Sequence, residues 1–485
     1  MGSFLQGKVI FVTIDDVLFV RKEDVRMQQA KKTMVQDLTG GSVAKLLLKF
    51  AFPLFVSNAL QAVYNIVDMV VIGQKMGDVG LSAVSNGGEV LHLLTFVAMG
   101  FSSAGQVIIA RQVGAGQMDK VKKTIGTMFS FLLGIALLMS VGCYFIRNWM
   151  LDTLNTPPES YQYTMDYTVT CIVGLVFIYG YNIVSAILRG MGDSRRPFMF
   201  VAIAAVMNIV LDLVFVYGMG MKVFGAALAT VISQGFSFII ALIYLYRSRE
   251  SFGFDFKPAS FKIDRETLKP LVSLGIPMAI QSAAINISKI VLMAWINAAD
   301  VAAGGVLYSA LAGIYNKVGM MSGIVSNSFT TAGASMVGQN LGARKYDRVP
   351  RIMGVVFLCG GTISVVLTLV VLLFPTAVFS IFTTEQAVLA AAGILIAPTI
   401  INFFGSATRA VAFSLINGSG NTKLNFAIAI IDGMISRVGI AALLGYGMKM
   451  GCQGFWFGDA LAGWMPFVIG MTYFLSGYWR KERKK

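Results

Sequence analysis

Residues 53–73, PLFVSNALQAVYNIVDMVVIG, are long and apolar enough to cross a lipid bilayer, which takes about 20 residues in a helix. The stretch nevertheless carries four polar side chains, at Asn58, Gln61, Asn65 and Asp68. Their offsets of 3, 7 and 10 residues from Asn58 place all four on one face of a helix. Because a carboxylate in hydrocarbon costs about 2.5–3.5 kcal/mol, this face must meet protein, water or a cation. The stripe is therefore either a polar contact that holds helices together or an ion or proton site.

The composition is that of an all-α integral membrane protein. Of the 485 residues, 56% are apolar and 13% are charged, whereas a soluble domain has about 25% charged residues. The four Cys residues are scattered without a CxxC spacing, so they predict neither a disulfide framework nor a metal cluster. The chain has one histidine, His92, which argues against a Ser/His catalytic centre. We therefore expect that the protein is not an enzyme.

The apolar segments predict twelve transmembrane helices, and the longest polar break, residues 247–267, falls after the sixth. Residues 1–42 read as a cytosolic tail in which Met27 and Met34 are alternative translation starts. We expect an N-lobe at 43–246 with helices 1–6, a cytoplasmic linker at 247–267, a C-lobe at 268–479 with helices 7–12, and a basic cytosolic tail at 480–485. The spans lie near 45–73, 83–111, 123–147, 161–188, 197–220, 223–246, 268–297, 306–338, 350–380, 386–416, 424–447 and 453–478.

The basic residues predict the orientation of the chain. Lys and Arg gather in alternate loops and near both ends, so the positive-inside rule puts both termini in the cytoplasm. We expect the protein in the inner (cytoplasmic) membrane of the cell. Of the 39 basic residues, 31 lie in these loops or near the ends and only four in the other loops, so the excess is mostly topogenic and leaves no support for nucleic-acid binding. The remaining four lie inside predicted spans of the second half: Lys289, Lys317, Arg409 and Arg437.

The two halves are an internal repeat. GAGQMDKV at 114–121 matches GARKYDRV at 342–349, an offset of 228, and VYGMGMKVFGAALAT at 216–230 matches GYGMKMGCQGFWFGD at 445–459, an offset of 229. Because each half has six spans, the repeats share one orientation, which predicts two pseudo-symmetric six-helix bundles with a cavity between them. The alignment sets acidic or neutral residues of the first half against charged residues of the second: Glu89 with Lys317, Asn65 with Lys289, Asn208 with Arg437, and Thr230 with Asp459.

The first half holds a set of hard oxygen donors. Asn208 and Asp212 are four residues apart and share a helix face, as do Thr230 and Gln234 in the next span. Together with Asp68 they suit Na⁺ or a shared proton rather than a soft metal. Two close carboxyl groups in a low dielectric cannot both stay ionised, so one is protonated or a cation binds.

Other polar residues inside the spans have two interpretations. Glu89 and His92, three residues apart, either join the proton path or make structural hydrogen bonds. The second-half residues predict an internal, charge-balancing network, because lone charges in lipid are costly. Any basic surplus that faced the cavity would attract an anion. The network residues are Lys289, Lys317, Arg409, Asp432, Arg437 and Asp459.

Several linked stretches resemble the multidrug and toxic compound extrusion (MATE) family over about residues 45–480. Besides residues 53–73 they are RQVGAGQ at 111–117, LRGMGDSRRP at 188–197, NIVLDLVFVYGMG at 208–220 and GAALATVISQ at 225–234. The pattern is most similar to the DinF-like branch. That resemblance implies a cation or proton site at Asp68, Asn208, Asp212 and Thr230. The chain departs from the NorM-like branch, because its seventh and tenth spans carry no acid.

The resemblance implies an antiporter that exports organic compounds, by default lipophilic cations, in exchange for H⁺ or Na⁺. It implies that the protein needs no cofactor and no metal beyond the coupling ion. It also implies a monomer in contact with membrane lipid. In this reading Asn58, Gln61, Asn65, Glu89 and Gln234 line the cavity or the proton path. Two alternatives stay open: an organic-anion exporter that uses the basic second-half residues, and a flippase for a lipid-linked precursor.

Overall fold

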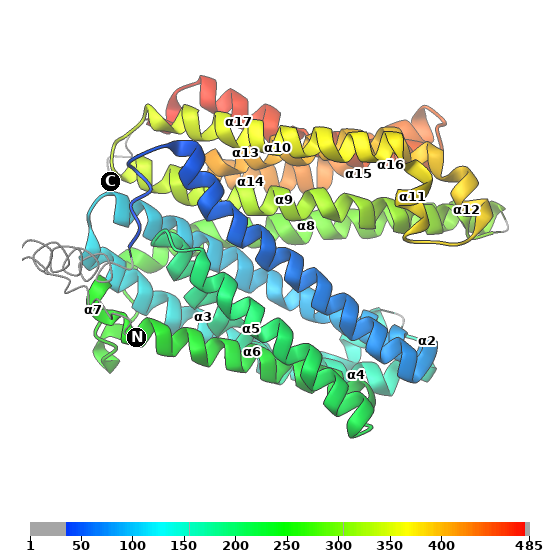
Figure 1. The fold of residues 1–485 in the computed structure, drawn as a ribbon, viewed down its shortest axis with the longest axis horizontal. Coiled ribbons are helices and arrows are strands. Elements are labelled where there is room, and N and C mark those ends of the chain that lie inside the picture. The colour runs from blue at the N-terminus through cyan, green and yellow to red at the C-terminus, as the bar shows by residue number, and fades with distance from the viewer. Residues whose placement is uncertain (1–34, 155, 304, 481–485) are drawn as a thin grey trace, which may run out of the picture.

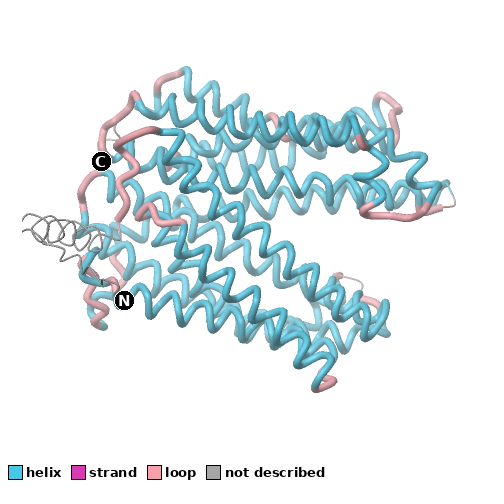
Figure 2. The backbone as a smooth tube through the Cα atoms, in the orientation of Figure 1, coloured by secondary structure: helices cyan, strands magenta, loops and turns pink. Residues whose placement is uncertain are grey.

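The computed structural model describes residues 35–154, 156–303 and 305–480. Across this part of the chain the regular elements are all helices, joined by short loops, so the predicted all-α fold is confirmed (Figure 2). Residues 1–34, with the alternative starts Met27 and Met34 and most of the predicted cytosolic tail, lie outside the described residues, as does the basic tail at 481–485.

The first bundle, here called the N-lobe, and the second bundle, the C-lobe, follow one another along the chain. The N-lobe consists of α2 (Val43–Gly114), α3 (Met118–Thr153), α4 (Pro158–Gly190), α5 (Arg195–Asp212) with the π-helix η1 (Leu213–Gly218), and α6 (Lys222–Arg247). The C-lobe consists of α8 (Arg265–Ala303), α9 (Leu307–Gly342), α10 (Arg348–Leu373), α11 (Pro375–Ser380), α12 (Gln386–Ala391), η3 (Ala392–Leu395), α13 (Ile396–Ser419), α14 (Thr422–Ile430), η4 (Ile431–Ser436), α15 (Arg437–Ala442), η5 (Leu443–Gly447), α16 (Cys452–Ala462), α17 (Met465–Leu475) and η6 (Tyr478–Arg480).

The helices correspond to the twelve predicted spans with local differences. In the described chain, nine helical stretches are long and apolar enough to cross a membrane. The first two spans form one of these, α2, which turns at Gly77, where φ is +62° and ψ is −150°, a conformation almost confined to glycine. Spans eight and twelve are α9 and the pair α16–α17, so the protein is a multi-pass membrane protein of twelve spans.

The linker between the lobes packs on α3. It holds the short helices α7 (Arg249–Phe252) and η2 (Pro258–Phe261), and the amide of Asp264 donates a hydrogen bond to the Thr127 hydroxyl (3.1 Å). The Thr267 hydroxyl donates to the Asp264 carboxylate (2.8 Å), and this bond lowers the pKa of Asp264. The carboxylate in turn accepts from the Thr267 amide at the start of α8, so it stabilises that helix end (3.0 Å).

The two lobes converge at the end where the described chain begins and ends, and diverge at the opposite end (Figure 1). At the convergent end, a Cβ atom built at Gly114 would collide with the Gln339 carbonyl oxygen, and one built at Gly342 would collide with the Arg111 carbonyl oxygen. The repeat offset of 228 maps each of these contacts onto the other. The last turns of α2 and α9 therefore cross backbone to backbone around the pseudo-twofold axis.

A short segment before α2 also closes this end, and we call residues 36–41 the strap. The Gln36 amide donates to the Met191 carbonyl of the N-lobe (2.8 Å), Thr39 donates to Asp37 within the strap, and further hydrogen bonds reach the C-lobe. The Leu38 backbone amide donates to Gln339 Oε1 (2.9 Å), and Asn340 Nδ2 donates to the Leu38 carbonyl (3.1 Å). Two basic side chains donate to further strap carbonyls: Lys345 Nζ to that of Thr39 (3.0 Å) and Arg348 Nη1 to that of Gly41 (3.0 Å).

We expect Gly114→Ala to destabilise this conformation by about 1–3 kcal/mol, because the new methyl group meets a backbone carbonyl that cannot rotate away. The matched control is Gly134→Ala in α3, where a Cβ would have no neighbour within 4 Å and alanine is the better helix former. Thermal unfolding of the detergent-solubilised protein measures both. Equal midpoints for the two variants would contradict the close crossing of α2 and α9.

Candidate transport cavity and ion site

Two hollows lie between the lobes and share part of their lining. The larger, the C-lobe branch, has a volume of about 730 Å³, and the other, the N-lobe branch, has about 570 Å³. They adjoin where side chains of α2 and α9 line both, and we call the two together the forked cavity. The shared lining residues are Glu89, His92, Met99, Ser103, Gln106, Asn327 and Thr331.

The polar stripe of the first span faces the N-lobe branch. All four of its residues, Asn58, Gln61, Asn65 and Asp68, line that branch. Asn58 also donates a hydrogen bond from Nδ2 to the Ser328 hydroxyl of α9 (3.0 Å), so the stripe contacts the other lobe as well. The opposite side of the same helix is exposed outward through Val63, Ile66 and Val70. The helical period thus turns the polar residues toward the cavity and the apolar residues toward lipid.

The predicted coupling residues come together at the wall of this branch. Asp68 of α2 lies beside Asp212 at the end of α5 and Thr230 of α6. Asn208 donates from Nδ2 to the Thr230 hydroxyl at 3.4 Å. Asp68 and Thr230 line the cavity, whereas Asp212 is fully buried behind them, and Asp68 is only 5% exposed.

Several oxygen atoms of these buried side chains have no hydrogen-bond partner in the part of the chain that the structure describes. Asp68 Oδ1, both carboxyl oxygens of Asp212, and Asn208 Oδ1 are buried without a hydrogen-bond partner among the described residues. A buried ionised carboxylate without a partner is strongly unfavourable, so the group must be neutralised by a proton or by a bound cation. Asp212 is also the last α-helical residue before the π-helix η1, and such rare turns gather at functional sites.

The other predicted residues of the first half lie along the cavity. Gln234 lines the N-lobe branch. Glu89 and His92 are exposed at the junction of the two branches, and the His92 ring packs on Phe96 with centroids 4.4 Å apart. Glu89 therefore places a carboxyl group on the N-lobe wall of the shared part.

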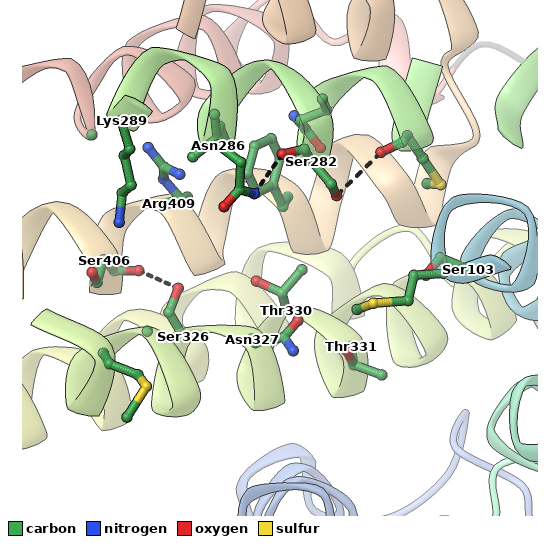
Figure 3. A pocket seen from close by; sticks show the side chains of 18 of the residues that line it. Ser103, Ser282, Asn286, Lys289, Ser326, Asn327, Thr330, Thr331, Ser406 and Arg409 are labelled. Carbon is green, nitrogen blue, oxygen red and sulfur yellow. Dashed lines mark hydrogen bonds between the residues drawn. The ribbon is translucent and has the colours of Figure 1, made fainter. Parts of the chain in front are cut away.

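The C-lobe brings together five of the six network residues. Arg437 forms an ion pair with Asp459 and another with Asp432 (3.6 Å), while Arg409 Nη2 lies 3.1 Å from Asp432 Oδ1. Lys289 lies near this group and lines the C-lobe branch, where its side chain is exposed. Figure 3 shows Lys289 and Arg409 on the wall of this pocket.

Lys317 is the sixth predicted network residue, and the structure does not join it to the others. Its side chain is exposed, and Nζ lies 5.9 Å from the centroid of the Phe382 ring. Its partner in the repeat alignment, Glu89, faces the cavity instead. The sequence alignment of these two positions therefore does not place them in equivalent surroundings.

Two other aligned pairs do occupy equivalent places. Asn208 hydrogen-bonds Thr230 in the N-lobe, and Arg437 pairs with Asp459 in the C-lobe, each residue 229 positions from its counterpart. At this contact the N-lobe has a neutral pair next to the carboxyl groups of Asp68 and Asp212, whereas the C-lobe has an ion pair. The Tyr315 hydroxyl donates a further hydrogen bond to Asp459 Oδ2 (3.0 Å), which leaves this acid fully engaged.

A polar chain that the sequence analysis missed joins the lobes at the wall of the cavity. Arg189, counted there among loop residues, is half-buried at the end of α4 and donates from Nε to Gln106 Oε1 (2.8 Å). Gln106 in turn donates from Nε2 to the Ser335 hydroxyl of α9 (2.8 Å). The signal in the sequence is Gln106 itself, a glutamine inside the second predicted span.

Comparison with known proteins decides the family. The family model MatE matches residues 53–214 and 277–443, more than half of the chain. The protein belongs to the MATE family of transporters. The predicted resemblance is thereby confirmed at the level of the family, while the DinF-like branch stays a prediction. Members of this family carry solutes across membranes, which agrees with the expectation that the chain is not an enzyme.

Two relatives of this MATE protein are from Bacillus subtilis (strain 168). The probable multidrug resistance protein YoeA is 27% identical over 468 residues, which cover 94% of this chain and 99% of YoeA. The probable multidrug resistance protein YpnP is 30% identical over 320 residues, which cover 64% of this chain and 68% of YpnP.

Solved structures share the fold. A MOP superfamily transporter from Pyrococcus furiosus, described as having a binding pocket of reverse polarity that suggests a different function, superposes with a TM-score of 0.83 at 21% identity. It covers 92% of this chain and 98% of its own. A MATE crystal structure in a bent conformation gives 0.80 at 22% identity, with 91% and 96% covered.

Proposed function

We propose that this MATE protein is a secondary antiporter that exports small organic compounds in exchange for H⁺ or Na⁺ bound at Asp68 and Asp212. The observation that carries the proposal is the pair of buried carboxyl groups with unpartnered oxygens beside a cavity. The names of YoeA and YpnP, as probable multidrug resistance proteins, support organic substrates.

The positions of the two acids suggest how an ion reaches the site and how its binding changes the packing of the helices. An ion from the cavity first meets Asp68 and Thr230, which line it, and Asp212 lies one step behind them. Binding of one H⁺ or Na⁺ removes one negative charge from the pair of acids, and release restores it, so the three helices α2, α5 and α6 prefer different packing in the two states. The π-helix η1 directly after Asp212 offers a place for that rearrangement.

We propose that only the N-lobe couples ion binding to transport. The C-lobe counterpart of the Asn208–Thr230 contact is the Arg437–Asp459 ion pair, whose acid already has a permanent countercharge. An acid held in this way does not need an incoming cation. We therefore assign coupling to the N-lobe acids, with the two lobes sharing the cavity.

The proposed orientation follows from the loop charges, which place both termini on the cytoplasmic side of the inner membrane. The lobes and the strap come together at the end of the molecule where the described chain begins and ends (Figure 1). On this orientation the conformation is closed toward the cytoplasm and faces outward. We propose that a monomer in contact with membrane lipid is the working unit.

Two substrate classes compete. The family resemblance favours lipophilic cations, and the acids of the N-lobe branch would attract them. Organic anions are the second candidate, because Lys289 and Arg409 line the C-lobe branch. A flippase for lipid-linked precursors stays a prediction from the sequence.

The test uses purified protein in liposomes loaded with a fluorescent lipophilic cation. We expect an imposed gradient of either H⁺ or Na⁺ to accelerate cation movement against its own gradient, and the effective gradient identifies the coupling ion. A K⁺ gradient of equal size with the membrane potential clamped is the control. Movement that never exceeds the cation's own equilibrium under either ion gradient would contradict antiport of lipophilic cations and favour the anionic class.

A further inference from the structure

We infer that the C-lobe branch binds an anionic group of the exported compound, a carboxylate, sulfonate or phosphate, through Lys289 and Arg409. The inference rests on the proposed function only in taking the ligand to be the exported compound. It assigns the substrate at least one negative charge, which the family resemblance does not provide. The argument begins with the charges that face the cavity.

Lys289 is a cation without a fixed partner. Its side chain is exposed to the C-lobe branch, and it makes no ion pair and no hydrogen bond with the rest of the described chain. An ammonium group inside the membrane-spanning region is costly unless water or a countercharge reaches it. A cavity that holds an anionic ligand supplies both.

Arg409 offers donors to the same space. Its Nη2 contacts Asp432, but its Nε and Nη1 groups make no hydrogen bond within the described chain. A guanidinium presents five N–H donors in a planar fork, and carboxylate and phosphate groups match this geometry. The contact with Asp432 therefore fixes the position of Arg409, and its Nε and Nη1 groups remain available to bind a ligand.

The nearby acids do not cancel these charges. Asp432 is fully buried and is shared by Arg409 and Arg437, while Asp459 is taken by Arg437 and Tyr315. Three cations thus face two carboxylates in the C-lobe wall, which leaves it one positive charge in excess. The surplus lies on the cavity side, at Lys289.

The acid on the opposite wall sets the direction of binding. Glu89 of α2 lines the shared part of the cavity, and Asp68 lies deeper in the N-lobe branch. His92 lines the same junction. A negative group is therefore repelled from the N-lobe side and attracted to the C-lobe side, so a compound that also carries a positive group would lie across the fork with its two charges separated.

Neutral donors extend the site. Gln281, two turns of α8 before Lys289, is 8% exposed and lines the C-lobe branch, and its amide nitrogen has no hydrogen-bond partner among the described residues. The hydroxyl of Ser406 and the side chains of Asn327 and Thr330 also line this branch (Figure 3). Its volume of about 730 Å³ lies within the range of about 300–1,000 Å³ typical of small-molecule pockets.

The test compares three probes that share one fluorophore: pyrenebutyrate, pyrenebutanol and pyrenebutylammonium. Binding to the full-length protein in nanodiscs of zwitterionic lipid is measured by equilibrium titration. We expect Lys289→Gln to weaken pyrenebutyrate binding about tenfold or more, since a charge-assisted contact is lost, and to leave pyrenebutanol binding unchanged. The matched control is Lys317→Gln, which removes an exposed lysine outside the cavity and should leave all three probes unaffected.

Competition experiments distinguish a soluble anion from a lipid headgroup as the source of the anionic group. The binding assay as a whole also tests the anion site separately from antiport. Competition of pyrenebutyrate by free benzoate, or by phosphatidylglycerol added to the nanodisc, would assign the site to a soluble organic anion or to a lipid headgroup. An equal loss of pyrenebutyrate and pyrenebutanol in Lys289→Gln, or no loss of either, would overturn the anion site. No ion gradient is imposed, so that result would leave antiport untouched, and a failure of gradient-driven efflux would leave the anion site untouched.

Discussion

Asp212→Asn is expected to lower gradient-driven efflux about tenfold or more, since the loss of one charge-assisted interaction is worth about 1.5–3 kcal/mol. The amide has the shape of the carboxyl group but cannot release a proton or neutralise a cation. Asp212 is fully buried, with both carboxyl oxygens unpartnered within the described chain, so its charge has no other compensation than the bound ion. The measurement is ion-driven transport of the fluorescent cation in proteoliposomes.

Asp68→Asn should cause a similar loss, because Asp68 lies between Asp212 and the cavity. The matched control is Asp152→Asn, the same chemical change at an exposed acid in α3, whose carboxylate accepts a hydrogen bond from Tyr161. It should transport as the wild type does. Full transport by Asp68→Asn and Asp212→Asn, at equal protein levels, would contradict coupling in the N-lobe.

The sequence predicted the features that depend on periodicity and repetition. The helical period of residues 53–73 is a property of the segment alone, so the placement of Asn58, Gln61, Asn65 and Asp68 on the cavity followed without knowledge of the neighbours. The offset of 229 likewise related the Asn208–Thr230 contact to the Arg437–Asp459 pair. The twelve spans and two lobes followed from hydropathy and the repeat.

Features that depend on the partner surface could not be predicted. The turn at Gly77 inside α2 and the π-helical turns η1, η4 and η5 arise from packing and backbone hydrogen bonds that have no simple sequence pattern. Hydropathy also cannot tell a lysine that faces the cavity, such as Lys289, from one that faces outward, such as Lys317. Arg189 was counted with the loops because its place on the cavity wall depends on its contact with Gln106.

Arg437→Met is expected to destabilise the protein by about 3–5 kcal/mol, because it leaves the buried acids without their main countercharge. Arg437 is 3% exposed and pairs with Asp459 and Asp432, both of which are buried. Methionine has a similar length but no charge and no donor. Chemical denaturation in detergent micelles measures the change in the free energy of unfolding.

The double variant Arg437→Met/Asp459→Asn separates the cost of an unpaired charge from the value of the pair. It removes the stranded acid, while Asp432 keeps its contact with Arg409, so most of the lost stability should return. The control Arg351→Met, at an exposed arginine of α10, should change stability by less than about 0.5 kcal/mol. If Arg437→Met were no more destabilising than this control, Asp459 would not depend on Arg437. The C-lobe acid would then be as free to bind a cation as Asp68 and Asp212, and the case for coupling in one lobe would fail.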